Sequence, residues 1–200
     1  MQPEIEVEIS NTQSHLQVQA ASLDRLVRMV LAAQHRLRAS ISIALVDNAT
    51  IHAINRAHLG HDWATDVITF PLADPDEPVL AGELVVSTEM ACIAAREFGV
   101  EPVEELALYV IHGLLHLCGL DDHDDSARRT MRQREDELLS QAGFTSPYPR
   151  ERVVARAEPE LQAESELLIA RETWPEPARD RSAGPRLPPA CELECRPWKA

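Results

Sequence analysis

Three histidines lie close together in the sequence, and their spacing suits a metal ion. His112 and His116 are four residues apart, so on a helix their side chains share one face, with Cβ atoms about 5–6 Å apart. Gly119 is a residue type that commonly ends a helix, and the chain beyond it can turn back to bring His123 toward the pair. Three protein ligands with a fourth position open are typical of a catalytic zinc site. The spacing therefore predicts one zinc ion held by His112, His116 and His123.

The residue directly after the first histidine separates this pattern from that of the helical metalloproteases. Those enzymes place a general-base glutamate there, in the motif His-Glu-x-x-His. This chain has Gly113 at that position, and glycine has no side chain that can take a proton from water. The pattern therefore favours a zinc hydrolase that is not a peptidase of that class.

The two helices that adjoin the predicted site have recognisable ends. Pro102 suits the first turn of a helix, where its missing N–H is not needed, and Gly119 suits the C-terminal cap. A helix is therefore expected from Pro102 to Cys118, with both of its histidines in the last two turns. Asp124 and the two residues after it can cap a last helix, which ends near Gly143.

The rest of the first three quarters of the chain alternates between short strands and helices. Strands are predicted at 5–9, 41–46, 67–70 and 83–87, where apolar and β-branched residues cluster between turn residues. Further helices are predicted at 20–37, after Asp47, and at 88–99. This order predicts an α+β fold, with a small mixed β-sheet of about four strands packed with about five helices and the zinc site at a helix C-terminus.

The last quarter of the chain has a different composition. Half of the 14 prolines lie there, and the segment has neither apolar density nor a regular period. Such composition is typical of chain that does not build a core. Two parts are therefore predicted: a catalytic domain over residues 1–149 and a flexible, proline-rich C-terminal extension over residues 150–200.

Composition points to the cytoplasm and away from a membrane. No stretch approaches the roughly 18 apolar residues that a membrane span needs, and the N-terminus lacks a signal-peptide pattern. Four cysteines in 200 residues do not make a disulfide framework. The net charge of −14 opposes nucleic-acid binding on average, although a bound dication offsets part of that repulsion.

Beyond these separate signals, the histidine segment resembles a known motif. The sequence His-Gly-Leu-Leu-His-Leu-Cys-Gly-Leu-Asp, followed by His123, is similar to the zinc motif of the YbeY family of bacterial single-strand endoribonucleases. Asn55 with Thr-Asp-Val-Ile-Thr-Phe-Pro at 65–71 resembles a second segment of that family, and Gly-Glu-Leu-Val-Val-Ser at 82–87 resembles a third. Order and spacing agree from about residue 4 to residue 148.

The resemblance implies a specific activity. It implies a single-strand-specific, zinc-dependent endoribonuclease that matures the 3′ end of 16S rRNA and takes part in ribosome quality control. Its implied partners are single-stranded rRNA and the small ribosomal subunit with its associated proteins. Zinc would polarise a phosphoryl oxygen and lower the pKa of water to about 7. His116, Asp66 and Asp122 are the candidate catalytic residues, with Asp121 a further candidate proton acceptor.

Two departures from the family pattern leave alternatives open. Asp122 stands where the family usually has its third histidine, and a carboxylate oxygen is also an accepted zinc ligand. Leu59 stands where the family commonly has an arginine implicated in RNA cleavage, so Arg56, His58 or His61 would have to substitute for it. One alternative function is therefore a ribosome-assembly factor with a structural zinc and little or no nuclease activity. A zinc hydrolase acting on another small or peptide substrate is a second alternative, against which Gly113 argues.

Positive charge for RNA is available in two groups of arginines. One lies on and just beyond the first predicted helix and the other near the start of the last. The favoured interpretation of both is a solvated helix surface. The groups are Arg25, Arg28, Arg36 and Arg38, and Arg128, Arg129, Arg132 and Arg134.

Overall fold

The computed structural model describes residues 4–74 and 77–144, and the extension predicted at 150–200 lies outside them. The described residues form four strands and five helices, as the sequence predicts. In chain order these are β1 (Glu4–Asn11), α1 (Ala20–Ala33), β2 (Arg38–Val46), α2 (Asn48–His58), β3 (Val67–Pro71), β4 (Leu80–Ser87), α3 (Thr88–Phe98), α4 (Pro102–Leu117) and α5 (Asp125–Gln141). Among these helices, none is long and apolar enough to cross a membrane.

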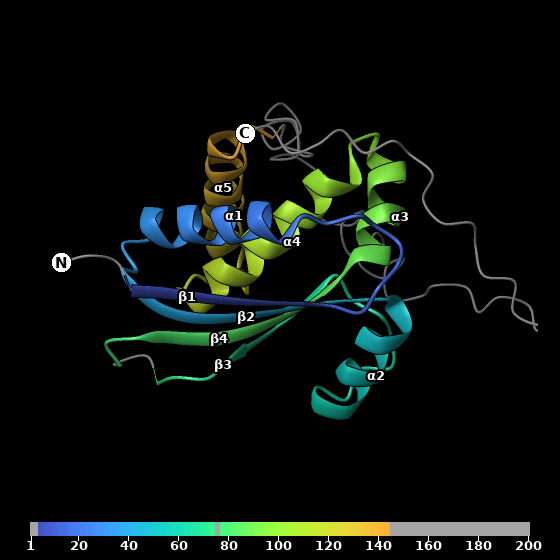
Figure 1. The fold of residues 1–200 in the computed structure, drawn as a ribbon, viewed down its shortest axis with the longest axis horizontal. Helices are drawn as coiled ribbons and strands as arrows, with labels where there is room; N and C mark the ends of the chain where they lie inside the picture. Colours follow the sequence, from blue (N-terminus) through green and yellow to red (C-terminus); the bar gives the residue numbers. More distant parts are fainter. Residues whose placement is uncertain (1–3, 75–76, 145–200) are drawn as a thin grey trace, which may run out of the picture. The chain divides into compact units, whose positions relative to one another are not determined.

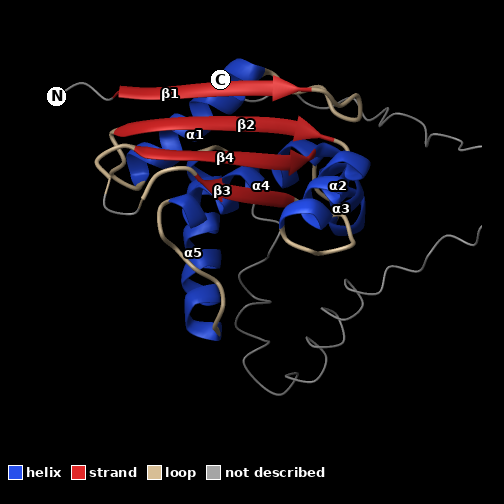
Figure 2. Ribbon diagram, turned by 90° about the horizontal axis from the view of Figure 1, so that it is seen from below, coloured by secondary structure: helices blue, strands red, loops and turns tan. Residues whose placement is uncertain are grey.

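The four strands form one mixed sheet in the order β1-β2-β4-β3. β1, β2 and β4 are parallel to one another, whereas β3 pairs antiparallel to β4 at the edge. The mixed sheet confirms the predicted α+β class. Figures 1 and 2 show α1 and α4 together on one side of the sheet and α2 on the other.

The side of the sheet under α1 and α4 holds the main core. Ile41, Ile43 and Leu84 point to this side, and each is at most 1% exposed. They meet the apolar faces of the two helices, among them Leu31 and Leu114, which are fully buried. Because α4 is covered by the sheet, α1, α3 and α5, it is apolar on nearly all sides up to the histidine turns.

A smaller apolar cluster lies on the other side of the sheet, under α2. Val46, Ile51, Ile68 and Val85 are its buried members. This cluster fixes α2 across the ends of β2, β3 and β4, so the loop from α2 into β3 is anchored at both ends. The predicted Asp47 cap at the start of α2 is present, with the Thr50 N–H donating to its Oδ1 at 2.8 Å.

The first helix is shorter than predicted. It was expected to continue to residue 37 but ends at Ala33, because His35 takes the left-handed conformation at φ 57°. The N–H groups of His35 and Arg36 then donate to Ala32 O and Leu31 O at 3.0 and 2.8 Å. This is the Schellman arrangement that usually carries a glycine at the position of His35. A histidine in that place gave the sequence analysis no stop signal.

Helix α4 runs unusually close to the sheet, and two glycines allow it. A Cβ on Gly113 would lie 2.7 Å from Leu84 Cδ2 and 3.0 Å from Thr69 Oγ1. On the sheet side, a Cβ on Gly82 would lie 2.6 Å from both methyl groups of Leu117. The close approach therefore depends on missing side chains on both surfaces. It places the last two turns of α4 directly over β3 and β4.

Replacing Gly113 with alanine is expected to destabilise the fold. The added methyl group meets Leu84, which is fully buried and has no space to yield. Overpacking of this kind costs about 1–3 kcal/mol. Denaturant unfolding of Gly113→Ala measures the loss, with Ser140→Ala on the exposed face of α5 as a control within about 0.5 kcal/mol of the parent. An unchanged free energy of unfolding for Gly113→Ala would contradict the close packing.

Candidate metal centre

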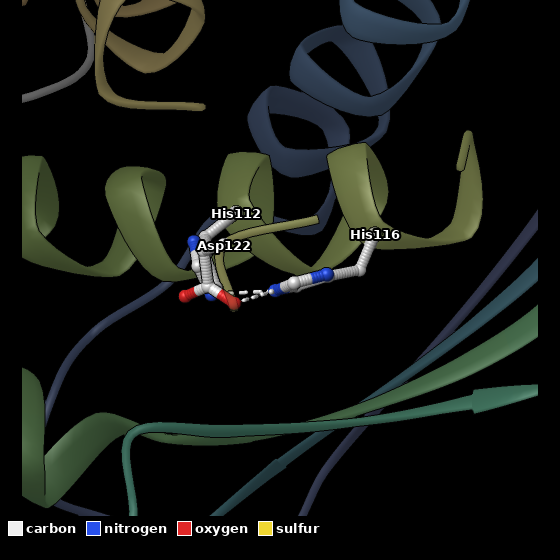
Figure 3. Close-up of side chains that lie close together, drawn as sticks. All are labelled: His112, His116 and Asp122. Atoms are coloured by element: carbon white, nitrogen blue, oxygen red, sulfur yellow. Dashed lines mark hydrogen bonds and ion pairs between the residues drawn. The ribbon is translucent and has the colours of Figure 1, made fainter. Parts of the chain in front are cut away.

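Two imidazole rings from consecutive turns of α4 meet at one point. His112 Nε2 and His116 Nε2 lie 3.0 Å apart, and the two rings are nearly perpendicular at 87°. Both side chains are about one quarter exposed, so the meeting point is reachable from solvent. Figure 3 shows the pair with the Asp122 carboxylate beside it. The predicted juxtaposition of His112 and His116 on one helix face is therefore present.

The other nitrogen of each ring is held by an acceptor. His116 Nδ1 lies 3.0 Å from the carbonyl oxygen of Leu120, and His112 Nδ1 lies 2.7 Å from Glu135 Oε1. A carbonyl oxygen only accepts, so His116 Nδ1 carries the hydrogen, and an ionised Glu135 requires the same of His112. In their neutral forms both rings then present a bare lone pair at Nε2. Two such lone pairs at 3.0 Å repel one another unless a cation lies between them.

The charges around His112 favour such a cation. Burial opposes a charge on the ring, but the hydrogen bond and negative charge of Glu135 outweigh it. The charges of Asp66 and Asp122 act in the same direction, and together they raise the pKa of His112 above its ordinary 6.5. A proton on His112 Nε2 competes with a metal ion, which must displace it to bind.

The C-terminal end of α4 is shaped to hold His116. Gly119 takes φ 96°, a conformation that glycine adopts without strain. This lets the Gly119 and Leu120 N–H groups donate to His116 O and Leu115 O at 2.9 and 3.0 Å. The same turn aims the carbonyl of Leu120 back at the His116 ring. The helix stop that the sequence predicts therefore also sets the orientation of a site residue.

Glu135 is a site residue that the sequence analysis missed. It lies on α5, its side chain is only 6% exposed, and its carboxylate is bound to His112. A signal was present, since Glu135 shares the buried face of α5 with Met131, Leu138 and Leu139. A glutamate on an apolar face needs a partner because burying an unpaired charge is costly. Ligating histidines commonly have such a carboxylate on their second nitrogen.

The third group at the meeting point is Asp122. One of its carboxylate oxygens lies within 4.8 Å of a ring nitrogen of both His112 and His116, and Asp122 Oδ1 is 3.8 Å from His116 Nε2. His123, the predicted third ligand, does not belong to this group. Its side chain is 88% exposed, and its Nε2 lies 3.4 Å from Asp121 Oδ1. Asp122, Asp121 and His123 form a second, more exposed group that could hold a cation.

The two other predicted site residues, Asp66 and Asp121, lie in separate turns of the chain. Asp66 lies at the start of β3, where its Oδ1 accepts from Thr65 Oγ1 and from the Val67 N–H, at 2.8 and 2.9 Å. Its charge reaches His112. Asp121 instead shapes the turn, because its Oδ1 accepts from the Asp122 N–H at 2.7 Å. Of the three aspartates, Asp66 and Asp122 are thus the two whose charge acts on the His112 ring.

The donor set fits a divalent metal ion. Two imidazole nitrogens and one carboxylate oxygen converge, and both histidines are oriented by acceptors on their far side. Imidazole and carboxylate ligands of this kind suit zinc and related transition metals. Cys118, at the end of α4, belongs to neither group of candidate ligands. Burial raises the pKa of its thiol, and the nearby Arg36 acts in the opposite direction.

The arginine groups make bonds within the protein. Arg28 Nε donates to Asp24 at 2.9 Å, an ion pair along α1. In α5, Arg134 donates to Glu137 at 2.8 Å and to the Ala33 carbonyl at 2.7 Å. These contacts favour the interpretation of a helix surface over that of an RNA-binding groove.

The family profile and the individual relatives that match this chain point to the same family. The sequence profile described as Endoribonuclease YbeY matches residues 8–143, which include every residue of the metal centre. A protein of that name from Carboxydothermus hydrogenoformans is 38% identical over 139 residues, covering 68% of this chain and 97% of the relative. A protein of the same name from Pelotomaculum thermopropionicum is 36% identical, covering 68% of this chain and 97% of the relative. Another from Rhodopirellula baltica is 44% identical, covering 55% of this chain and 57% of the relative.

Glu135→Gln is expected to weaken zinc binding without unfolding the protein. The amide keeps the shape of the side chain but loses the charge that holds and polarises His112. Loss of such a partner typically costs 10–100-fold in metal affinity. Competition with a zinc chelator dye measures the change. Glu137→Gln, two residues along on the exposed face of α5, is the matched control and should bind zinc like the parent.

The third ligand can be identified by comparing two neighbouring substitutions. The geometry predicts that Asp122→Ala weakens zinc binding by about tenfold or more, whereas His123→Ala has a much smaller effect because its ring lies in solvent. The same chelator competition measures both. A larger loss for His123→Ala would mean that the turn after Gly119 rearranges around the ion.

Proposed function

The chain belongs to the endoribonuclease YbeY family, and from that membership we propose that it is a zinc-dependent endoribonuclease acting on single-stranded RNA in rRNA processing. Its substrate in this proposal is the 3′ end of 16S rRNA, and its role includes ribosome quality control. Single-stranded rRNA and the small ribosomal subunit with its proteins are then its partners, which places the reaction in the cytoplasm.

The observation that carries the proposal is the paired imidazole site. His112, His116 and Asp122 would hold the ion, and Glu135 and the Leu120 carbonyl would keep the two rings in place. A bound zinc ion supplies Lewis acidity toward a phosphoryl oxygen and lowers the pKa of water to about 7. Because both rings are partly exposed, a phosphodiester can approach this point from solvent.

The chain's own residues also account for proton transfer. Asp66 is held at its Oδ1 by Thr65 and by the backbone of Val67, which fixes its carboxylate near His112. We assign Asp66 the role of proton acceptor, while Asp122 acts as a ligand. A peptidase base is not available at Gly113, because that position is filled by the packing of α4 on Leu84. The hydrolytic chemistry therefore favours a phosphodiester over a peptide.

One observation favours an alternative function. Leu59, at the C-terminal cap of α2, is 51% exposed and carries no charge for a phosphate. Arg56 is also exposed but lies 3.8 Å from Asp62, which offsets its charge. With a net charge of −14, these features suit a ribosome-assembly factor that keeps the metal for structure.

RNA cleavage by the zinc-loaded protein separates the two functions. Purified protein is incubated with single-stranded RNA carrying the 3′ region of 16S rRNA. Cleavage is expected, and His116→Ala or chelation of the metal should abolish it because the ion loses a ligand or leaves. His35→Asn, an exposed histidine whose left-handed conformation asparagine tolerates, should cleave like the parent. Tight binding to the small subunit with no cleavage would instead support the assembly factor.

A further inference from the structure

The loop between α2 and β3, which leads to Asp66, exposes large apolar side chains. Leu59 and Trp63 are 51% and 43% exposed, and they account for two of the five large hydrophobic side chains that the described residues expose. Both lie within a segment of five residues. An exposed tryptophan is costly in contact with water, so its retention on a surface commonly marks a contact site.

The exposed tryptophan is part of an aromatic stack. The rings of His61 and Trp63 are nearly parallel at 10°, with centroids 4.6 Å apart. Both residues are exposed. The two rings therefore stack face to face on an exposed loop, and the stack ends in the outer face of a ring.

The stack is held rigidly from beneath. Asn55, which is only 2% exposed, donates from its side-chain Nδ2 to the Trp63 carbonyl at 2.9 Å, and its backbone carbonyl accepts from the Leu59 N–H at 2.9 Å. Asp62, which lies between His61 and Trp63 in the sequence, binds His52 Nε2 at 2.8 Å. These bonds hold the loop in place without a ligand, so binding costs little further conformational entropy.

The loop leads directly into the metal centre. Trp63 precedes Asp66 by three residues, a chain length that spans at most about 11 Å. The charge of Asp66 acts on His112, and β3, which begins at Val67, packs against α4. A strand of RNA whose phosphate lies at the metal centre would therefore have a neighbouring base within reach of the stack.

Charge alone does not explain how this chain would hold RNA. Arg28 of α1 and Arg134 of α5 bond to nearby groups, and the chain is strongly acidic. Stacking of bases on aromatic side chains supplies affinity that does not depend on positive charge, and it is available only to unpaired bases. It thus suits a single-stranded substrate of a strongly acidic protein.

On the premise of the proposed nuclease function, we propose that the His61–Trp63 stack is a platform on which an unpaired base of the RNA substrate stacks next to the metal centre. Trp63 is a positioning residue that does not touch the reacting phosphate. It raises affinity for single strands and sets which phosphate lies at the ion. A duplex, whose bases are already stacked on each other, gains nothing from the platform.

The test uses the full-length, zinc-loaded protein and a fluorescein-labelled single-stranded oligoribonucleotide. Stopped-flow anisotropy gives the Kd before cleavage proceeds. Trp63→Ala is expected to raise the Kd about tenfold, and Trp63→Phe, which keeps an aromatic face, to restore most of the affinity. Leu72→Ala is the matched control, because Leu72 is 65% exposed and follows β3 at the end away from Trp63. Its Kd should equal that of the parent.

Kinetics and a duplex probe distinguish a platform from a merely structural role. Trp63→Ala should raise KM with kcat nearly unchanged, whereas a disturbed metal site would lower kcat. Binding of the same sequence as a duplex should not respond to the substitution. An unchanged Kd and KM for Trp63→Ala, in a protein that cleaves RNA, would overturn the platform and leave the proposed function intact. Trp63-dependent binding without cleavage would support the platform and contradict the nuclease.

Discussion

Two imidazole nitrogens with their lone pairs directed at each other across 3.0 Å are the constraint on which the account rests. When both rings carry their hydrogen on the far nitrogen, which each ring's acceptor favours, this arrangement is stabilised by a positive charge between the rings. Glu135 is one acceptor, through a buried carboxylate from α5, and Leu120 is the other, through a carbonyl at the end of α4. The centre is thus built by two helices and one turn.

The packing of α4 determines where this centre faces. Because Gly113 and Gly82 leave room, the helix lies close against β3 and β4, and its histidine turns lie over the middle and the end of β3. Asp66 immediately precedes this strand and follows the loop that carries Trp63. Close helix–sheet packing therefore brings the metal centre onto the strand that follows Asp66 and the loop with the aromatic stack. None of these groups is adjacent to the others in sequence, apart from Trp63 and Asp66.

Much of this arrangement could be predicted from the sequence, since local signals determine it. The four strands, the Asp47 cap, the helix over Pro102–Leu117 and the facing pair of His112 and His116 follow from periodicity and turn residues. Contacts between distant segments could not be predicted so directly. Glu135 meets His112 only because α5 packs on α4, and the choice between Asp122 and His123 depends on the path of a turn one residue longer or shorter. His35 ended α1 through a conformation that its residue type rarely adopts.

X-ray absorption at the zinc K-edge of the zinc-loaded protein tests the central claim most directly. The account predicts one stoichiometric ion with two imidazole nitrogens at about 2.0–2.1 Å, further oxygen ligation and no sulfur. The two imidazole contributions should fall to one in His116→Ala. Sulfur ligation at about 2.3 Å, or zinc that binds without imidazole, would contradict the shared ion between His112 and His116.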